Sequence, residues 1–85
     1  MNQENSELLL SYIDRALKIR EDWWFYEIKL DLLLKNKRLN EAEQVTQKAI
    51  DFIKKSNHGE REILTKVFQE KLEKARKQWW TQILH

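Results

Sequence analysis

The feature that most constrains this chain is a shortage of helix breakers, because its 85 residues contain no proline and only one glycine. Proline ends or kinks a helix and glycine weakens it, whereas Leu, Lys, Glu, Gln and Arg are good helix formers. The one cluster of turn residues is the segment 56–59. The sequence therefore predicts an all-α fold in a single domain spanning residues 1–85.

Four helices are expected, joined by short links. Ser6 and Asp22 can cap the first two helices, and Asn40 with Glu43 three residues later resembles a capping box for the third. Gly59 can take the left-handed conformation in the link before the fourth helix. The predicted helices cover residues 6–20, 22–36, 40–55 and 60–84.

Links this short place consecutive helices antiparallel, so the predicted architecture is a set of stacked helical hairpins with a long C-terminal helix. The first three helices would each be roughly 22 Å long and the fourth about 37 Å. The fourth helix should therefore extend two or three turns beyond its neighbours.

Composition excludes several classes of protein. Zero cysteines exclude disulfides, thiolate metal sites and thiol catalysis. With 41% apolar and 35% charged residues, the chain is too apolar for disorder and too charged for a membrane protein. No apolar run approaches the length of a transmembrane helix, and the polar start is unlike a signal peptide. We expect a cytoplasmic protein without a transmembrane segment.

Catalysis finds little support in the sequence. The two histidines, His58 and His85, have no partner at helical spacing, so no metal site is predicted. No glycine-rich loop offers a phosphate cradle. We therefore expect no catalytic residues, no metal and no cofactor, and a protein that is not an enzyme.

Two segments of similar character suggest an internal repeat. Ala16 and Ala49 lie 33 residues apart within comparable apolar and charged patterns, and that spacing is typical of helical-pair repeats. The segment Leu39-Asn-Glu-Ala42, followed by Ala49 and Ile50, resembles the second helix of a tetratricopeptide repeat (TPR). The resemblance covers about residues 12–70 and implies about one and a half units.

The chain departs from the TPR pattern in places. Lys37 stands where the family usually has a turn glycine, and the proline after the second helix is missing. Lys29 and Leu30 occupy the Leu-Gly positions. A plain four-helix bundle with a chance similarity is the alternative.

Four consecutive aromatic residues begin the predicted second helix. On a helical wheel, Trp23, Phe25 and Tyr26 fall on two apolar faces, as expected for a helix packed between neighbours on both sides. Trp24 instead falls on a polar strip that carries Lys35 among other charged residues. We expect Trp23, Phe25 and Tyr26 to be core. Trp24 is expected either to be a surface residue, packed on the Lys35 stem or against the first helix, or to be part of a binding site.

The TPR resemblance favours the binding site. In that family the first helix of each pair lines a concave peptide groove, and no carboxylate-clamp pattern of Asn and Lys is present here. We expect the function of a protein–protein interaction module or small adaptor, with Glu27 and Asp31 attracting a basic or apolar peptide segment. Asp31 and Lys35 are also spaced as an i,i+4 ion pair. The groove residues that the resemblance implies are Trp24, Glu27, Asp31, Leu34 and Lys35 and, one repeat unit further on, His58, Arg61, Thr65 and Gln69.

The end of the fourth helix carries an apolar strip, and leaving several large apolar side chains in water forgoes about 1.5–3 kcal/mol for each. We expect this strip to form a homodimer with a second copy of the chain. Docking on a different protein is the second choice, and a bend near residues 74–77 that folds the strip back on its own core is the third. The strip comprises Leu72, Ala75, Trp79, Trp80, Ile83 and Leu84.

The same helix suggests a second function. Its basic residues lie beside Trp79 and Trp80, a combination that can bind nucleic acid or an anionic membrane surface. Four glutamates interrupt the basic residues, and the net charge of the chain is only +2. Nucleic-acid or membrane binding is therefore the alternative and not the favoured function.

Overall fold

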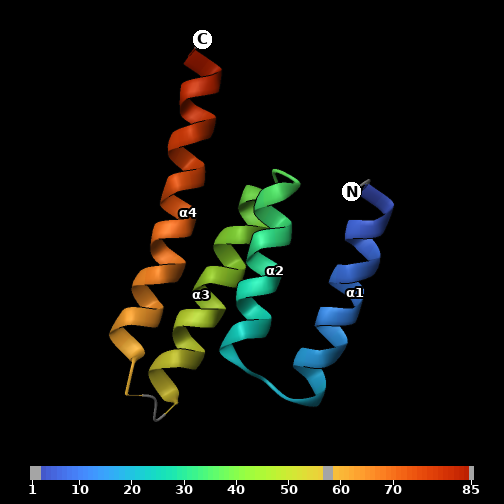
Figure 1. The fold of residues 1–85 in the computed structure, drawn as a ribbon, viewed down its shortest axis with the longest axis vertical. Helices are drawn as coiled ribbons and strands as arrows, with labels where there is room; N and C mark the ends of the chain where they lie inside the picture. The colour runs from blue at the N-terminus through green and yellow to red at the C-terminus, as the bar shows by residue number, and fades with distance from the viewer. Residues whose placement is uncertain (1–2, 57–58, 85) are drawn as a thin grey trace.

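The protein is a stack of four α-helices, seen in a computed structural model that describes the backbone of residues 3–56 and 59–84 and the side chains of residues 5–56 and 59–78. The helices are α1 (Gln3–Ile19), α2 (Trp23–Lys35), α3 (Leu39–Lys55) and α4 (Arg61–Leu84). Figure 1 shows them running alternately up and down, and the described residues contain no strand. The all-α prediction is confirmed.

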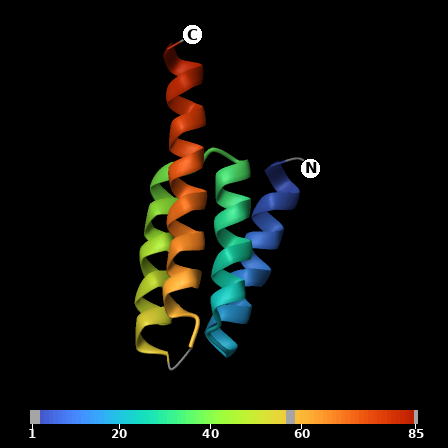
Figure 2. The same cartoon turned by 60° about the vertical axis from the view of Figure 1, so that its left-hand side comes forward.

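The helices pack mainly on their neighbours in sequence. α2 packs between α1 and α3, α3 packs on α4, and a smaller contact joins α2 to α4. Figure 2 shows α4 beside α3 while α1 lies at the other end of the stack. The core therefore centres on α2, α3 and α4, where the largest fully buried side chains are Phe68, Leu30, Leu33 and Ile53.

Local signals set some helix ends as expected. The Asp22 carboxylate accepts a hydrogen bond from the backbone N–H of Trp23 at 2.8 Å, which caps α2. α1 begins at Gln3, so Ser6 lies inside the helix and not at its cap; its side chain is buried.

The cap of α3 differs from the expected capping box. The N-cap is Arg38, and no side chain caps the helix. Instead the Arg38 guanidinium donates to both carboxylate oxygens of Glu41, at 2.7 and 2.9 Å, and also binds Glu7 of α1. These ion pairs hold Glu41 in the first turn, and the helix starts one residue before Asn40.

The left-handed residue is in a different link from the one expected. Gly59 has a negative φ, because α3 already ends in an extended cap at Ser56, whose hydroxyl donates to the Ile53 carbonyl at 2.8 Å. Lys37 has φ 58° in the α2–α3 turn. There the backbone N–H of Arg38 donates to Leu33 O at 2.9 Å and that of Lys37 to Leu34 O at 3.1 Å. These two bonds form a Schellman motif.

α4 is a continuous helix of 24 residues, whereas α3 has 17. The end of α4 extends beyond the other helices in Figures 1 and 2, as predicted, and it does not fold back. Arg76 of α4 binds Glu43 of α3 at 2.7 Å near the end of the shared length. No helix in the described residues is long and apolar enough to cross a membrane.

Candidate interaction surface

α2 meets a different neighbour on each of three sides. The Lys29 ammonium reaches Asp14 of α1 at 2.6 Å, and the Tyr26 ring lies 6.0 Å from the Phe52 ring of α3. Glu27 faces α4. At about 100° per residue, Trp24 and Ile28 fall on the remaining side, between the sides that face α4 and α1 and opposite α3. That side of α2 is the one left open to solvent.

The aromatic cluster divides between core and surface. Tyr26 is buried, its hydroxyl donates to Glu21, and Trp23 is half-buried against the core. Phe25 is half-buried and lies outside the core cluster. Trp24 is 53% exposed, and its ring centroid lies 6.2 Å from those of Trp23 and Phe25.

The acidic pair of the expected groove is already bound within the chain. The Lys71 ammonium of α4 lies 2.8 Å from Asp31 and 3.4 Å from Glu27. Partial burial lowers the pKa of Lys71, but the hydrogen bond and charge of Asp31 and the charge of Glu27 raise it above its ordinary value overall. Asp31 thus pairs across helices and not with Lys35, since Lys71 brings the closer ammonium.

The groove residues on α4 do not face those on α2. Gln69 lies about 160° around α4 from Lys71, the residue that reaches α2. Arg61, Thr65 and Gln69 instead border a shallow hollow of about 520 Å³ together with Lys54 of α3. The structure therefore brings Trp24, Glu27 and Asp31 to one face and places the α4 residues on another. Leu34 is half-buried against the core and Lys35 is exposed.

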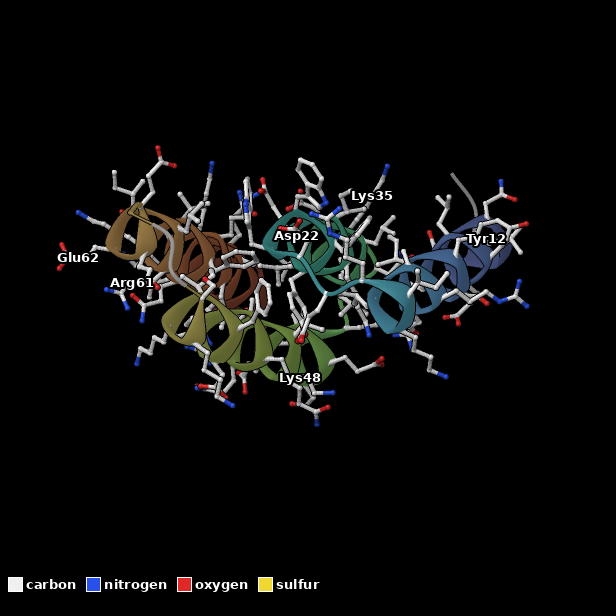
Figure 3. All side chains as sticks on the ribbon, turned by 90° about the horizontal axis from the view of Figure 1, so that it is seen from below. Tyr12, Asp22, Lys35, Lys48, Arg61 and Glu62 are labelled. Atoms are coloured by element: carbon white, nitrogen blue, oxygen red, sulfur yellow. The ribbon has the colours of Figure 1, made fainter. Side chains whose placement is uncertain are left out.

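Exposed apolar side chains gather on α1 and α2. Among the described residues, seven large apolar side chains are exposed, and only Ile63 lies outside these two helices. Figure 3 shows Tyr12 of α1 and Lys35 of α2 away from Lys48 of α3. Trp24 and Ile28 lie on the open side of α2, whereas Tyr12 and Ile19 lie about 160–180° around α1 from Leu10, which packs toward α2. We use the name α1–α2 apolar face for all six exposed side chains of the two helices: Leu8, Leu9, Tyr12, Ile19, Trp24 and Ile28.

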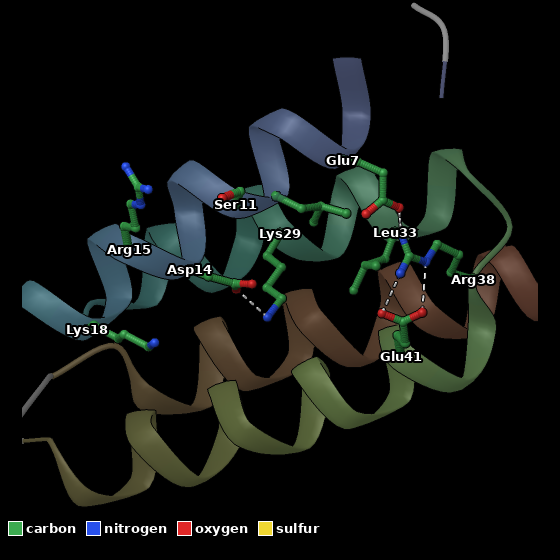
Figure 4. A pocket seen from close by; sticks show the side chains of 10 residues that line it. Glu7, Ser11, Asp14, Arg15, Lys18, Lys29, Leu33, Arg38 and Glu41 are labelled. Carbon is green, nitrogen blue, oxygen red and sulfur yellow. Dashed lines mark hydrogen bonds and ion pairs between the residues drawn. The ribbon is translucent and has the colours of Figure 1, made fainter. Parts of the chain in front are cut away.

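The other side of α1 is polar. It borders a hollow of about 370 Å³ between α1, α2 and α3, shown in Figure 4. Arg38 binds Glu7 and Glu41 there, and Lys29 binds Asp14. The acids that line this hollow are therefore each paired with a cation.

Sequence reasoning missed the α1 half of the apolar face. Its signal was present, because Leu9, Tyr12 and Ile19 recur at helical spacing beside a second apolar stripe on the same helix. Which of the two stripes would meet α2 depends on tertiary packing, and only the structure shows it.

Part of the predicted strip at the end of α4 belongs to the molecule's own core. Leu72 and Ala75 are buried in the molecule's own core, so they are not available to a second copy. Trp79, Trp80, Ile83 and Leu84 lie in the part of α4 that extends beyond the stack, and their side chains lie outside the described residues.

The basic residues of α4 are partly engaged in ion pairs. Lys71 and Arg76 bind carboxylates of α2 and α3, and Lys77 lies 3.6 Å from Glu73. Within the described residues no cluster of His, Cys, Asp or Glu could hold a metal ion. His58 and His85 lie outside the described residues.

Comparison with known proteins finds no match for this chain, whether among protein-family models, curated proteins or solved structures.

Proposed function

We propose that this protein is a non-enzymatic protein–protein interaction module that binds an apolar segment of its partner through the α1–α2 apolar face. One observation carries the proposal, namely that six of the seven exposed large apolar side chains described lie on these two helices. Single exposed apolar residues are ordinary on a protein surface, and the concentration of six of them on two neighbouring helices is what supports an interaction site there.

The exposed side chains are large enough to contribute useful binding energy. Trp24 and Ile28 are 53% and 48% exposed, and Tyr12 is 54% exposed. Full burial of a large apolar side chain contributes about 1.5–3 kcal/mol, so covering the exposed half of several of them favours a specific complex. Tryptophan and tyrosine are also the residues most enriched among energetically dominant interface positions.

The partner segment is apolar and not basic in this proposal. Glu27 and Asp31 would attract a basic segment only if Lys71 released them, and Lys71 binds both at 3.4 and 2.8 Å. An apolar segment needs no such exchange, because Trp24 and Ile28 lie beside the acidic pair and are already open.

A degenerate TPR-like stack is the scaffold that we propose for this face. Its support is the alternation of helices and the left-handed Lys37 at the position where the TPR pattern places a turn glycine. In a stack of this kind the end surfaces must be covered or polar. A stack of fewer than about three repeat units has only marginal stability by itself.

We also propose that the end of α4, from Lys77 onward, contacts a second copy of the chain. The support is its extension beyond the stack together with the sequence of residues 79–84, which holds four large apolar residues. Sedimentation of the wild type and of Trp79→Glu/Ile83→Glu should show a dimer for the first and a monomer for the second. A monomeric wild type at tens of micromolar contradicts this part.

The main proposal is tested by affinity capture from native extract. Wild-type protein should retain a discrete partner at high salt, and Trp24→Ala/Ile28→Ala should lose it while keeping its melting temperature. The control is Ile63→Ala, which removes an apolar side chain of α4 that is 65% exposed. A salt-sensitive nucleic acid in place of a protein, or equal loss in the control, would overturn the proposal.

A further inference from the structure

α1 carries two apolar stripes, and only one of them has a neighbour. The inner stripe packs on α2 and contains Leu10, Ile13 and Leu17. The outer stripe, which we define as Leu9, Tyr12, Ala16 and Ile19, follows the alternating spacing of three and four residues that makes a continuous helix-packing seam. Its Tyr12 is 54% exposed and its Ile19 86% exposed.

The internal repeat indicates what the outer stripe lacks. The 33-residue offset that aligns Ala16 with Ala49 also aligns the outer stripe with a stripe on α3. On α3 this stripe is covered, because Ala42, Val45 and Ala49 are buried in the core, and Phe52 meets Tyr26 of α2. The corresponding stripe on α3 is Ala42, Val45, Ala49 and Phe52.

α1 and α3 therefore correspond to each other in their packing as well as in sequence. α3 packs between α2 on one side and α4 on the other, and α1 packs on α2 alone. In the repeat, the contact of α1 with α2 corresponds to the contact of α3 with α4. The neighbour missing from α1 is thus a helix in the place that α2 occupies against α3.

The charges around the outer stripe define the chemistry of that helix. At about 100° per residue Arg15 lies on one flank of the stripe and Arg20 on the other. Both are exposed, as is Lys35 of α2, and none of the three forms an ion pair within the described residues. The acids of α1 with described side chains, Glu7 and Asp14, are bound on the opposite side by Arg38 and Lys29.

We infer that the outer stripe of α1 is the docking site for an amphipathic helix of a partner protein, with an apolar face against the stripe and acidic residues along its edges. The helix lies antiparallel to α1, as α2 does to α3. This inference rests on the proposed function and specifies the partner. A second copy of α1 is a poorer occupant, because the pairing would bring Arg15 and Arg20 of both copies to one interface while Glu7 and Asp14, the acids of α1 with described side chains, lie on the opposite side.

The test is a selection from a displayed library of amphipathic helices about 20 residues long, a length at which isolated helices become stable enough to compete. The apolar face of each helix is fixed and its edge positions are randomised among Glu, Lys, Gln and Ser. Helices selected on the wild-type protein should be rich in glutamate at the edges.

Three variants locate the binding. Tyr12→Glu/Ile19→Glu should abolish capture of the selected helices. Arg15→Glu/Arg20→Glu should lower the affinity for the glutamate-edged helices roughly tenfold or more and should favour helices with lysine at the edges. Lys48→Glu, on the exposed side of α3, is the matched control and should change neither the capture of the selected helices nor their preference for acidic edges. All of the altered side chains are exposed, so circular dichroism should be the same for each variant.

Three results would overturn the inference: no enrichment of any helix, enrichment without acidic edges, or binding that survives Tyr12→Glu/Ile19→Glu. A wild type that sediments as a dimer and becomes monomeric in this variant would also overturn it, because a second copy would then occupy the stripe. Failure here is distinguishable from failure of the proposed function, since capture from extract is judged with Trp24→Ala/Ile28→Ala, outside the stripe.

Discussion

Lys37 is the one described non-glycine residue with a positive φ, and it stands at the turn between α2 and α3. A side chain with a Cβ in the left-handed region costs about 1 kcal/mol relative to glycine. We therefore expect Lys37→Gly to raise the free energy of unfolding by about 0.5–1 kcal/mol in urea titration. Lys48→Gly, in the exposed middle of α3, is the control and should lower it by about 1 kcal/mol. Equal effects of the two changes would contradict the role of the turn.

Tyr26 makes stability depend on alkaline pH. Burial, and then the hydrogen bond to Glu21 and the negative charge of that residue, raise the pKa of the Tyr26 hydroxyl above its ordinary value of 10.0. The folded protein keeps the proton that the unfolded chain releases near pH 10, so this contribution is complete below about pH 10 and decreases as the pH rises toward the folded pKa.

The Tyr26 contribution can be isolated by substitution. Between about pH 9 and 11 the free energy of unfolding of Tyr26→Phe should fall less than that of the wild type, because the variant has no proton to lose. Glu21→Gln should show an intermediate slope, since it removes the charge and keeps a hydrogen-bond acceptor. Urea titrations at several pH values measure this. Parallel curves for wild type and Tyr26→Phe would show that Tyr26 ionises equally in both states.

At the scale of elements, Lys71 is the described polar link between α2 and α4. Lys71→Met keeps most of the apolar stem and removes the charge, so we expect a loss of up to about 1 kcal/mol that shrinks as salt is added. Lys66→Met, on an exposed part of α4, is the control and should change stability little. A double-mutant cycle with Asp31→Asn measures the coupling energy between Lys71 and Asp31. A coupling energy near zero would contradict a stabilising contact between α2 and α4 at this pair.

Helices were predictable here because their signals are local. Asp22 lies next to the amide that it caps, and the link at residues 56–59 is the one polar interruption of a helix-forming chain. Ion pairs were not predictable, because Arg38 could bind Glu7 and Lys71 could bind Asp31 only after distant segments met. The pairing of Lys71 with Glu27 and Asp31 neutralised the acids of the expected groove.

The candidate site was predictable in part for the same reason. The helical wheel placed Trp24 on an open side of α2, and the structure leaves it exposed. The helical wheel could not show which face of α4 turns toward α2. Arg61, Thr65 and Gln69 recur at helical spacing and so looked as suitable for a groove as the face that carries Lys71, yet they border a different hollow. The exposed apolar residues of α1 could not be predicted, because their exposure depends on the lack of a helix beyond α1. That lack is a feature of how the whole stack is arranged.

For the molecule as a whole, stability should be distributed unevenly. Among the described residues α1 packs on α2 alone, whereas α3 has two neighbouring helices and α2 has three. Local opening is easiest where fewest apolar contacts are lost, so backbone amides of α1 should exchange hydrogen for deuterium faster than those of α2 and α3. Mass spectrometry of labelled peptides measures this. Adding a selected acidic helix should slow exchange in α1, and uniform exchange across the helices would contradict the expectation.

The nearest-neighbour arrangement of the helices also has a kinetic consequence. Apart from the smaller contact between α2 and α4, each packed interface joins helices that follow one another, so most contacts close short loops. Chains with such local contacts fold in about microseconds to milliseconds, because little chain entropy is lost before packing compensates for it. With no proline and no cysteine, isomerisation at proline and disulfide exchange cannot delay the chain. The hairpin of α2 and α3 has the most extensive contact, so it is the natural nucleus, and α1 should be the last helix to join it.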